Sequence, residues 1–250
     1  MRLALHRGGR CRDGGGVIRA LLFDVFGTLV DWRRGIAREA QSVLSPLGIS
    51  IDWHAFADAW RGQYQPAMEE VRAGRIPFSK LDALHRRNLD IVIRDFGLER
   101  IDEATRAKLN LAWHKLDAWP DVAPGLSRLR PRFRLAPCSN GNISIMADLA
   151  RRNGFVWDAI LGAEIARDYK PKPSVYVASA DAFDCAPHEA MMVAAHSSDL
   201  AAAASAGLRT AFVARPDEAG PGRGEAKPSV TVDVSASSLV DLAARLSSVE

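Results

Sequence analysis

The chain has 250 residues, 48% of them hydrophobic and 25% charged, and its 33 Lys and Arg against 30 Asp and Glu give a formal net charge of +3. This composition is typical of a globular protein, and so balanced a charge excludes the broad basic surface of a nucleic-acid-binding protein. No segment approaches the roughly 18 uninterrupted apolar residues of a membrane helix. The small positive bias is compatible with a small anionic substrate.

The first 16 residues are rich in Arg and Gly and lack the apolar core of a signal peptide, so we expect a flexible extension at 1–16. The three cysteines, Cys11, Cys138 and Cys185, are too few and too irregularly spaced for a disulfide framework or a metal site. They favour a reducing cytoplasm. We interpret Cys138 as a small buried hydrophobic residue rather than a nucleophile.

The first predicted strand, 17–23, is almost wholly apolar and is followed at once by Asp24. Near-continuous apolarity is typical of a strand that is buried on both faces of a parallel sheet. Later apolar runs alternate with helical patterns, which predicts a doubly wound α/β core. The later strands are expected at 133–138, 190–195, 208–214 and, more weakly, 230–234, and the helices at 142–153, 174–184 and 198–206.

The segment 32–118 has a helical pattern throughout, which predicts an all-helical cap inserted after the first strand. Apolar side chains recur every three or four residues from Trp53 to Val71 and indicate one amphipathic helix. Asp52 and Ser79 are the expected N-caps of this helix and of a later one. The core is then formed by 17–31 and 119–250, and the other cap helices are expected near 33–45, 79–96 and 102–117.

Three polar side chains, Asp24, Ser139 and Asp199, lie at or just past the ends of predicted strands. In open α/β sheets, ligands bind beyond the carboxyl ends of the strands. We therefore expect these side chains to converge beneath the cap in a closed, water-poor pocket.

The run from Phe23 to Leu29, with Asp24 at its second position, resembles the first signature of the haloacid dehalogenase superfamily. The resemblance implies a Rossmann-like core with an inserted cap and makes Asp24 a carboxylate nucleophile that forms a covalent ester. Without it, an Asp that caps the next turn would be an ordinary interpretation. Three further signatures follow in the same order, so that the resemblance covers about 17–215; they lie at 135–140, 169–171 and 191–199.

Two positions separate this sequence from the phosphatases of the superfamily. Phosphatases generally carry an acidic residue two positions after the nucleophile, where this chain has Phe26, and another four before the last Asp of the fourth motif, where it has Ala195. A hard cation such as magnesium prefers several oxygen ligands. The sequence therefore resembles the type II (S)-2-haloacid dehalogenases, and the resemblance implies a site without a metal or a cofactor.

The resemblance also assigns roles to other side chains. Arg61 matches the catalytic arginine that receives the halide and helps to hold the substrate carboxylate, although an arginine at the edge of an apolar helix face is common. Lys170 would keep Asp24 ionised, and Asp199 would anchor Lys170 and position the water. The remaining arginines of the cap are interpreted as solvated surface: Arg33, Arg34, Arg72, Arg75, Arg86 and Arg87.

Five further positions complete the predicted site. Ser139 and Tyr176 would form hydrogen bonds around it, and Thr28 would hold Asp24 or its loop. Phe26 and Asn140 would contact the substrate or the halide. His196 stands where the family keeps an active-site Asn, so it is either structural or catalytic, and whether His196 or Asp199 handles the hydrolytic water stays open.

The predicted reaction converts short (S)-2-haloalkanoic acids into 2-hydroxy acids in two steps. Asp24 displaces the halide toward Arg61, and water then hydrolyses the ester at the Asp24 carboxyl carbon. One alternative is a phosphatase that acts through an aspartyl-phosphate, which Phe26 and Ala195 oppose. The other is a non-catalytic binding protein on the same fold, which is opposed by the joint presence of Asp24, Lys170, Ser139 and Asp199. The preferred halide and chain length stay open, as does assembly as a homodimer.

Overall fold

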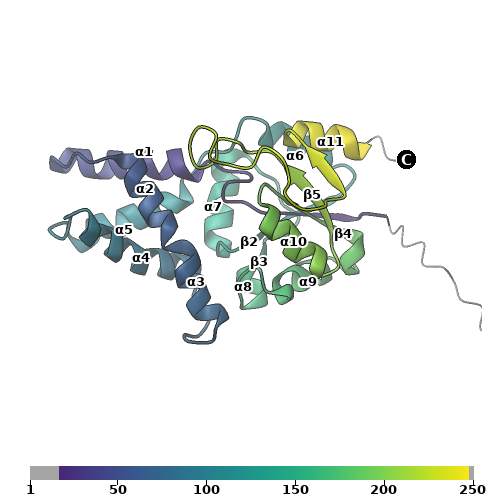
Figure 1. Cartoon of the computed structure of the whole chain (residues 1–250), viewed down its shortest axis with the longest axis horizontal. Coiled ribbons are helices and arrows are strands. Elements are labelled where there is room, and N and C mark those ends of the chain that lie inside the picture. The colour runs from purple at the N-terminus through teal and green to yellow at the C-terminus, as the bar shows by residue number, and fades with distance from the viewer. Residues whose placement is uncertain (1–16, 248–250) are drawn as a thin grey trace, which may run out of the picture.

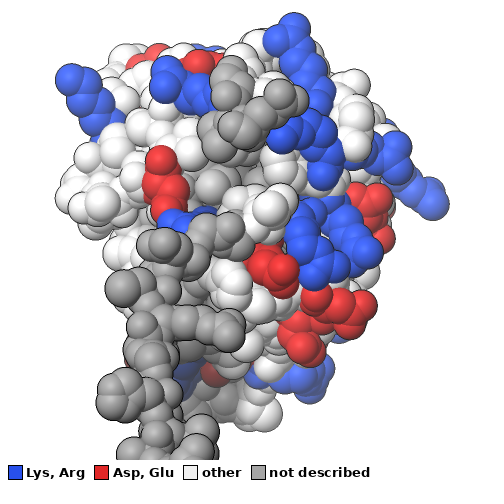
Figure 2. Space-filling model, turned by 90° about the vertical axis from the view of Figure 1, so that its right-hand side faces the viewer, with Lys and Arg blue, Asp and Glu red and all other residues white. Residues whose placement is uncertain are grey.

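The computed structural model describes residues 17–247, so the extension expected at 1–16 lies outside the described residues. Figure 1 shows a sheet with helices around it and, beside it, a group of helices formed by the segment after the first strand. No helix of the described range is both long and apolar enough to cross a membrane. On the face seen in Figure 2, basic and acidic side chains lie among one another, as the small net charge predicts.

The sheet consists of six parallel strands in the order β3-β2-β1-β4-β5-β6. β1 pairs with β2 and β4, so that Phe23 lies opposite Pro137 and Val193. All four residues of β1 are buried, as its continuous apolarity predicts. The strands are β1 (Ala20–Phe23), β2 (Arg134–Ser139), β3 (Leu161–Gly162), β4 (Ala190–Ala194), β5 (Arg209–Val213) and β6 (Val234–Ala236).

Helices cover both faces of the sheet, and alternate strand residues point to each face. Leu21 and Phe23 belong to a buried cluster with α6, α7 and α11, whereas Ala20 and Leu22 belong to a second cluster with α9 and α10. The prediction of a doubly wound α/β core is confirmed. Its helices are α6 (Val122–Leu129), α7 (Ile143–Asn153), α8 (Ala163–Ala166), α9 (Pro173–Asp181), the 3-10 turn η3 (Pro187–Glu189), α10 (Ser197–Ser205) and α11 (Leu239–Ser247).

The strand prediction is wrong at both edges of the sheet. The weak run at 230–234 is irregular up to Asp233, whose carboxylate accepts hydrogen bonds from Thr210 N and Oγ1, and the strand begins only at Val234. β3 has two residues and was not predicted. An edge strand pairs on one side only, so it needs no long apolar run to mark it.

The helices beside the sheet are formed by the segment after β1. The single helix expected from Trp53 to Val71 is wrong, because it is divided at Gln63. Pro66 has no N–H to donate to the carbonyl of Gly62, which ends the first helix there. The elements are α1 (Trp32–Leu44), η1 (Ser45–Leu47), α2 (Trp53–Gly62), α3 (Tyr64–Arg72), α4 (Leu81–Asp95), α5 (Glu103–Asn110) and η2 (Leu111–His114).

One of the two predicted N-caps is confirmed. Asp52 accepts hydrogen bonds from the backbone N–H groups of His54 and Ala55, both at 2.9 Å. Ser79 is not an N-cap, because α4 begins after Lys80 and the Ser79 hydroxyl donates instead to the Pro77 carbonyl. The Asp52 side chain thus satisfies two backbone N–H donors at the start of α2, which have no partner within the first turn of that helix.

The two segments that join the helices of 32–118 to the sheet run side by side. Val30 and Ala118 form an antiparallel bridge, and Asp31 N donates to the Asp117 carbonyl at 2.9 Å. Trp119 N donates to the Leu29 carbonyl at 3.0 Å. The inserted helices therefore leave and rejoin the core at one place.

His114 links these helices to the core. Its Nε2 lies 3.0 Å from Asp82 of α4, and its Nδ1 lies 2.7 Å from Asp148 of α7. Burial lowers the pKa of His114, but the two carboxylates raise it by more, so that it lies above the ordinary value of 6.5. The histidine is then a charged link between α4 and α7.

We expect His114→Gln to lower the free energy of unfolding by about 1–2 kcal/mol at pH 6. The folded-state pKa is raised, so this contribution is fully present below the unfolded pKa and is lost as the pH rises through the folded pKa. The deficit should therefore shrink toward pH 10 in urea unfolding curves. His188→Gln, at an exposed position, is the control. A deficit that does not change with pH would contradict the charged link.

Candidate active site

The carboxyl ends of β1, β2 and β4 open into a cavity of about 400 Å³ between the sheet and the helices of 32–118. β1 delivers Asp24, β2 leads to Asn140, and β4 leads into the N-terminal turn of α10. The cavity therefore lies where an open α/β sheet binds its ligands. It is lined by Asp24, Phe26, Arg61, Tyr64, Gln65, Arg72, Asn140, Lys170, Pro171, His196, Ser198 and Asp199.

Asp24 is 7% exposed, and three side chains bind its carboxylate. Lys170 Nζ lies 2.9 Å from Oδ1, while Thr28 Oγ1 and His196 Nδ1 lie 2.7 and 3.0 Å from Oδ2. Burial by itself would raise the pKa of Asp24, but Lys170, His196 and Thr28 together hold it below its ordinary value. Asp24 is therefore an ionised carboxylate at the floor of the cavity.

Lys170 lies between two carboxylates. Its Nζ donates to Asp24 at 2.9 Å and to Asp199 Oδ2 at 2.5 Å, and the hydroxyl of Tyr176 donates to Asp199 Oδ1 at 2.5 Å. Burial lowers the pKa of Lys170, but the charges of Asp199 and Asp24 raise it well above 10.5. The ammonium group is charged, and it holds both acids in place.

Asn140 and Ser139 follow β2 but have different positions. Asn140 lines the cavity, and its Oδ1 accepts a hydrogen bond from Lys170 N at 2.8 Å. Ser139 is fully buried outside the lining, and its Oγ accepts from Gly141 N at 3.0 Å. Ser139 thus shapes the turn after the strand, whereas Asn140 is available to a ligand.

Phe26 reaches the cavity from the loop after β1, and Arg61 reaches it from helix α2. The ring of Phe26 meets Tyr64 and Trp113 edge to face, with centroid distances of 6.3 and 5.5 Å. The guanidinium carbon of Arg61 lies 4.1 Å from the centroid of the Tyr64 ring. Its Nη1 is buried and has no hydrogen-bond partner among the described residues. A buried, charged donor without a partner is the kind of group that an anion would satisfy.

The rings of His85 and Trp113 lie next to those of Phe26 and Tyr64, and no sequence motif marks either residue. Their rings stack at 4.1 Å, and within 17–247 neither ring has a hydrogen-bond partner for its nitrogen atoms. Burial lowers the pKa of His85 to about 3, so its ring is neutral. Together with Phe26 and Tyr64, these rings form an apolar side of the site.

His196 lies between two carboxylates. Besides its contact with Asp24, its Nε2 lies 2.8 Å from Glu218 Oε2. Burial lowers the pKa of His196, but hydrogen bonds and charges of Asp24 and Glu218 raise it to about 10. Glu218 lies in the irregular segment between β5 and β6, where no periodic pattern or motif marks it.

The expectation of a solvated Arg72 is wrong. Its side chain is 10% exposed, it lines the cavity beside Gln65, and its Nη1 donates to the Lys170 carbonyl at 2.8 Å. Arg33 is also largely covered, at 15% exposed, by its ion pair with Asp58. Arg72 follows Arg61 by about three helical turns, and this spacing was the available sign that both face one side.

A magnesium ion of the kind that phosphatases of the superfamily hold does not fit these residues. The carboxylates of Asp24 and Asp199 are both bound to the Lys170 ammonium. Position 195 is a buried alanine, whose backbone N–H donates to Thr28 Oγ1. Among residues 17–247 no three His, Cys, Asp or Glu side chains gather as metal ligands would.

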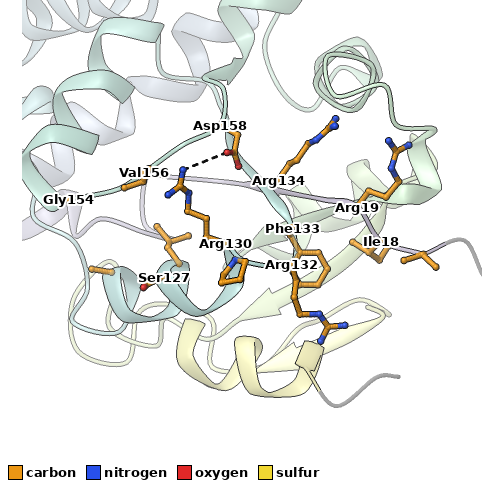
Figure 3. A pocket seen from close by; sticks show the side chains of 14 residues that line it. Ile18, Arg19, Ser127, Arg130, Arg132, Phe133, Arg134, Gly154, Val156 and Asp158 are labelled. Atoms are coloured by element: carbon orange, nitrogen blue, oxygen red, sulfur yellow. Dashed lines mark ion pairs between the residues drawn. The ribbon is translucent and has the colours of Figure 1, made fainter.

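A larger hollow, of about 890 Å³, lies at the opposite, amino-terminal edge of the sheet (Figure 3). Four arginines reach its rim, and one of them, Arg130, pairs with Asp158 at 3.9 Å. The guanidinium groups of Arg19, Arg132 and Arg134 donate to backbone carbonyls. Among residues 17–247, the lining of this hollow has no nucleophile beside a base, so the smaller cavity is the candidate active site.

Comparison with known proteins points to one family. The family model described as haloacid dehalogenase-like hydrolase matches residues 18–207. (S)-2-haloacid dehalogenase 1 of Pseudomonas sp. (strain CBS-3) is 29% identical over 203 residues, which are 79% of this chain and 85% of that protein. Two solved structures are 43% identical: the defluorinating L-2-haloacid dehalogenase Rha0230, with a TM-score of 0.90 over 92% of this chain and 96% of that one, and the L-2-haloacid dehalogenase PA0810, with 0.88 over 92% and 99%.

Proposed function

Because the chain belongs to the haloacid dehalogenase-like hydrolases, we propose that it hydrolyses the carbon–halogen bond of short (S)-2-haloalkanoic acids and releases 2-hydroxy acids. The relatives named above act on 2-haloacids, and the cavity joins the ionised Asp24 carboxylate to an apolar wall and two arginines. Free, buried Cys138 and Cys185 support a cytoplasmic location as part of the proposal.

The observation that carries the proposal is the Asp24 carboxylate, ionised at the cavity floor with Phe26 beside it. An Asp oxygen attacks the substrate α-carbon opposite the halogen, inverts that centre and forms a covalent ester. At position 26 a phosphatase would need a proton donor, and a phenyl ring cannot supply one. The ring instead suits the alkyl part of a haloacid.

Arg61 is proposed to receive the departing halide and to help hold the substrate carboxylate. Its buried Nη1 has no partner among the described residues, and a halide beside it would provide one. Its guanidinium stays charged through the reaction. Asn140, whose carbonyl is bound to the Lys170 backbone, presents its amide group to the same space.

Hydrolysis of the ester is proposed to follow at the Asp24 carboxyl carbon, with Asp199 as the group that handles the water. Asp199 lines the cavity and is fixed by Lys170 and Tyr176. Lys170 stays charged between both carboxylates, so it neutralises Asp24 again when the ester opens. We further propose that the segment 32–118 acts as a cap over the core formed by 17–31 and 119–250.

The proposed function is tested by halide release from each enantiomer of 2-chloropropionate. We expect chloride from the (S)-enantiomer and (R)-lactate as the product, because backside attack inverts the α-carbon. Release from the (R)-enantiomer alone, or no release from either, would contradict the proposed function. Hydrolysis of a generic phosphoester instead would support the phosphatase alternative.

We expect full dehalogenation in excess EDTA, because an ammonium group lies between the two acids that would otherwise hold a metal. The measurement is the initial rate of chloride release before and after chelation. Added magnesium serves as the control and should not change the rate. Loss of activity in EDTA that magnesium restores would overturn the metal-free mechanism.

A further inference from the structure

A line of hydrogen bonds runs from α1 to the nucleophile. Trp32 Nε1 donates to Glu218 Oε1 at 2.9 Å, Glu218 Oε2 lies 2.8 Å from His196 Nε2, and His196 Nδ1 lies 3.0 Å from Asp24 Oδ2. Gly27 makes room for Glu218, since a Cβ there would lie 2.0 Å from Glu218 Oε1. The Glu218 side chain is only 11% exposed, so its contact with His196 is largely buried and is not a surface ion pair.

The geometry fixes the protonation of His196. Carboxylates only accept hydrogen bonds, and both ring nitrogens of His196 lie within hydrogen-bond distance of a carboxylate oxygen. Both nitrogens must then carry a proton, so the ring is an imidazolium. A protonated histidine cannot take a proton from water.

We propose that Glu218 is a positioning residue that keeps His196 protonated, so that His196 stabilises the oxyanion formed during hydrolysis of the Asp24 ester instead of acting as the base. This inference rests on the proposed function and deepens it. His196 then acts in the second step, the hydrolysis of the ester, and Asp199 is the group that takes the proton from water.

The two oxygens of Asp24 are differently placed for this chemistry. Oδ2 is held by two donors, Thr28 and His196, whereas Oδ1 is held by Lys170. The oxygen with one donor is freer to attack, so Oδ1 joins the substrate carbon and Oδ2 becomes the ester carbonyl. Donors that are already aimed at the oxygen where charge develops need no rearrangement.

The second step is the addition of water to the Asp24 ester. The oxygen of water bonds to the Asp24 carboxyl carbon, one water proton passes to Asp199, and the carbonyl electron pair moves to Oδ2 between Thr28 and His196. On collapse, the bond from the carboxyl carbon to Oδ1 breaks, and the product oxygen takes the proton from Asp199. Asp24 loses the second water proton to solvent and is a carboxylate again, while His196 stays protonated throughout.

Four charged groups set the protonation of His196. Asp24 and Glu218 face its two nitrogens, whereas Lys170 lies on the far side of Asp24, and Arg61 acts on Glu218 from α2. Esterification removes the charge of Asp24, so Glu218 is then the only carboxylate in hydrogen-bond contact with the ring among the described residues. Its charge therefore matters most in the step where His196 is needed.

The test is the pH dependence of ester hydrolysis, measured in single turnovers by the decay of the covalent adduct in intact mass spectra. For the wild type we expect hydrolysis to be fast at neutral pH and to fall on the alkaline side, as His196 loses its proton. Glu218→Gln keeps an acceptor but removes the charge, so the alkaline fall should move about 1–3 pH units lower. Titration of ¹⁵N-labelled His196 by NMR should move by the same amount in the enzyme without substrate.

Three variants make the result specific. Glu225→Gln removes a charge from the same segment, where Glu225 binds Ser197, and should leave the alkaline fall in place. Glu218→Asp keeps the charge and should restore much of the wild-type profile. His196→Ala should slow ester hydrolysis by about 10²–10³-fold, with less effect on ester formation, so that the adduct accumulates.

Opposite results would overturn the inference. If hydrolysis instead rises with pH through the titration of His196, the histidine is a base. If Glu218→Gln leaves both the rate profile and the NMR titration unchanged, Glu218 is not the group that keeps His196 protonated. Failure of the proposed function would look different. Neither the wild type nor any variant would then form an adduct with a 2-haloacid, while the NMR titration would still report the effect of Glu218 on His196.

Discussion

Asp24→Asn is expected to reduce dehalogenation by at least about 10⁴-fold, to the background rate. The amide keeps the shape of the side chain and can still accept the hydrogen bond from Thr28. It has no negative charge, so it cannot displace a halide, and the Lys170 ammonium loses one of its two carboxylates. The measurement is chloride release at saturating substrate, with circular dichroism to show that the fold is kept.

Isotope labelling separates this mechanism from direct attack by water. In a single turnover in ¹⁸O-labelled water, the wild type should place the label in the Asp24 carboxylate and release unlabelled 2-hydroxy acid. The peptide that contains Asp24 can be analysed by mass spectrometry, and the Asp24→Asn variant is its control. Label that enters the product in the first turnover would rule out the ester.

Lys170→Met should have the second largest effect, on both rate and stability. The substitution keeps the length of the side chain but leaves the buried carboxylates of Asp24 and Asp199 without their shared cation. Breaking a buried ion pair from one side costs about 3–5 kcal/mol, so we expect a loss of that order in the free energy of unfolding at pH 7. Without Lys170, burial favours the neutral form of Asp24, and turnover should fall by roughly 10³-fold or more.

The stability deficit of Lys170→Met should shrink as the pH falls. Without the Lys170 charge, burial raises the folded-state pKa of Asp24, so protonation of Asp24 at low pH relieves its uncompensated charge. Lys172→Met, at an exposed position two residues further along the chain, is the matched control and should be close to wild type. A Lys170→Met enzyme with normal turnover would remove Lys170 from the mechanism.

The core of the fold could be predicted because its strands are buried on both faces. β1 and β4 are apolar at every position, and the polar residue that ends each run marks the edge where ligands bind. The helices of 32–118 were predictable as a class but not in their limits. Apolar spacing runs unbroken through Gln63, whereas a single missing N–H at Pro66 divides the helix.

The candidate site was predictable where a motif or a strand end marks a residue. The structure brings Asp24, Lys170, Asp199 and Arg61 to one cavity. Glu218 could not be found in this way, since it reaches the site from an irregular segment whose path depends on tertiary contacts. The exposure of Arg72 was predicted wrongly because a charged side chain is ordinarily solvated. Its contact with the Lys170 carbonyl depends on how α3 packs against the loop before α9, which the sequence does not show.

The side-by-side joints at Val30 and Ala118 have a consequence for how such an enzyme can change. Because the chain leaves and rejoins the sheet at neighbouring points, the helices between them can be exchanged, shortened or lengthened without altering the register of any core strand. Asp24 and Lys170 belong to the part of the chain that forms the sheet, whereas Arg61 and Arg72 belong to the segment between the two joints. A different segment grafted between these two joints should therefore alter the substrate range while Asp24, Lys170 and Asp199 stay in place, and it has to supply an arginine where Arg61 stands.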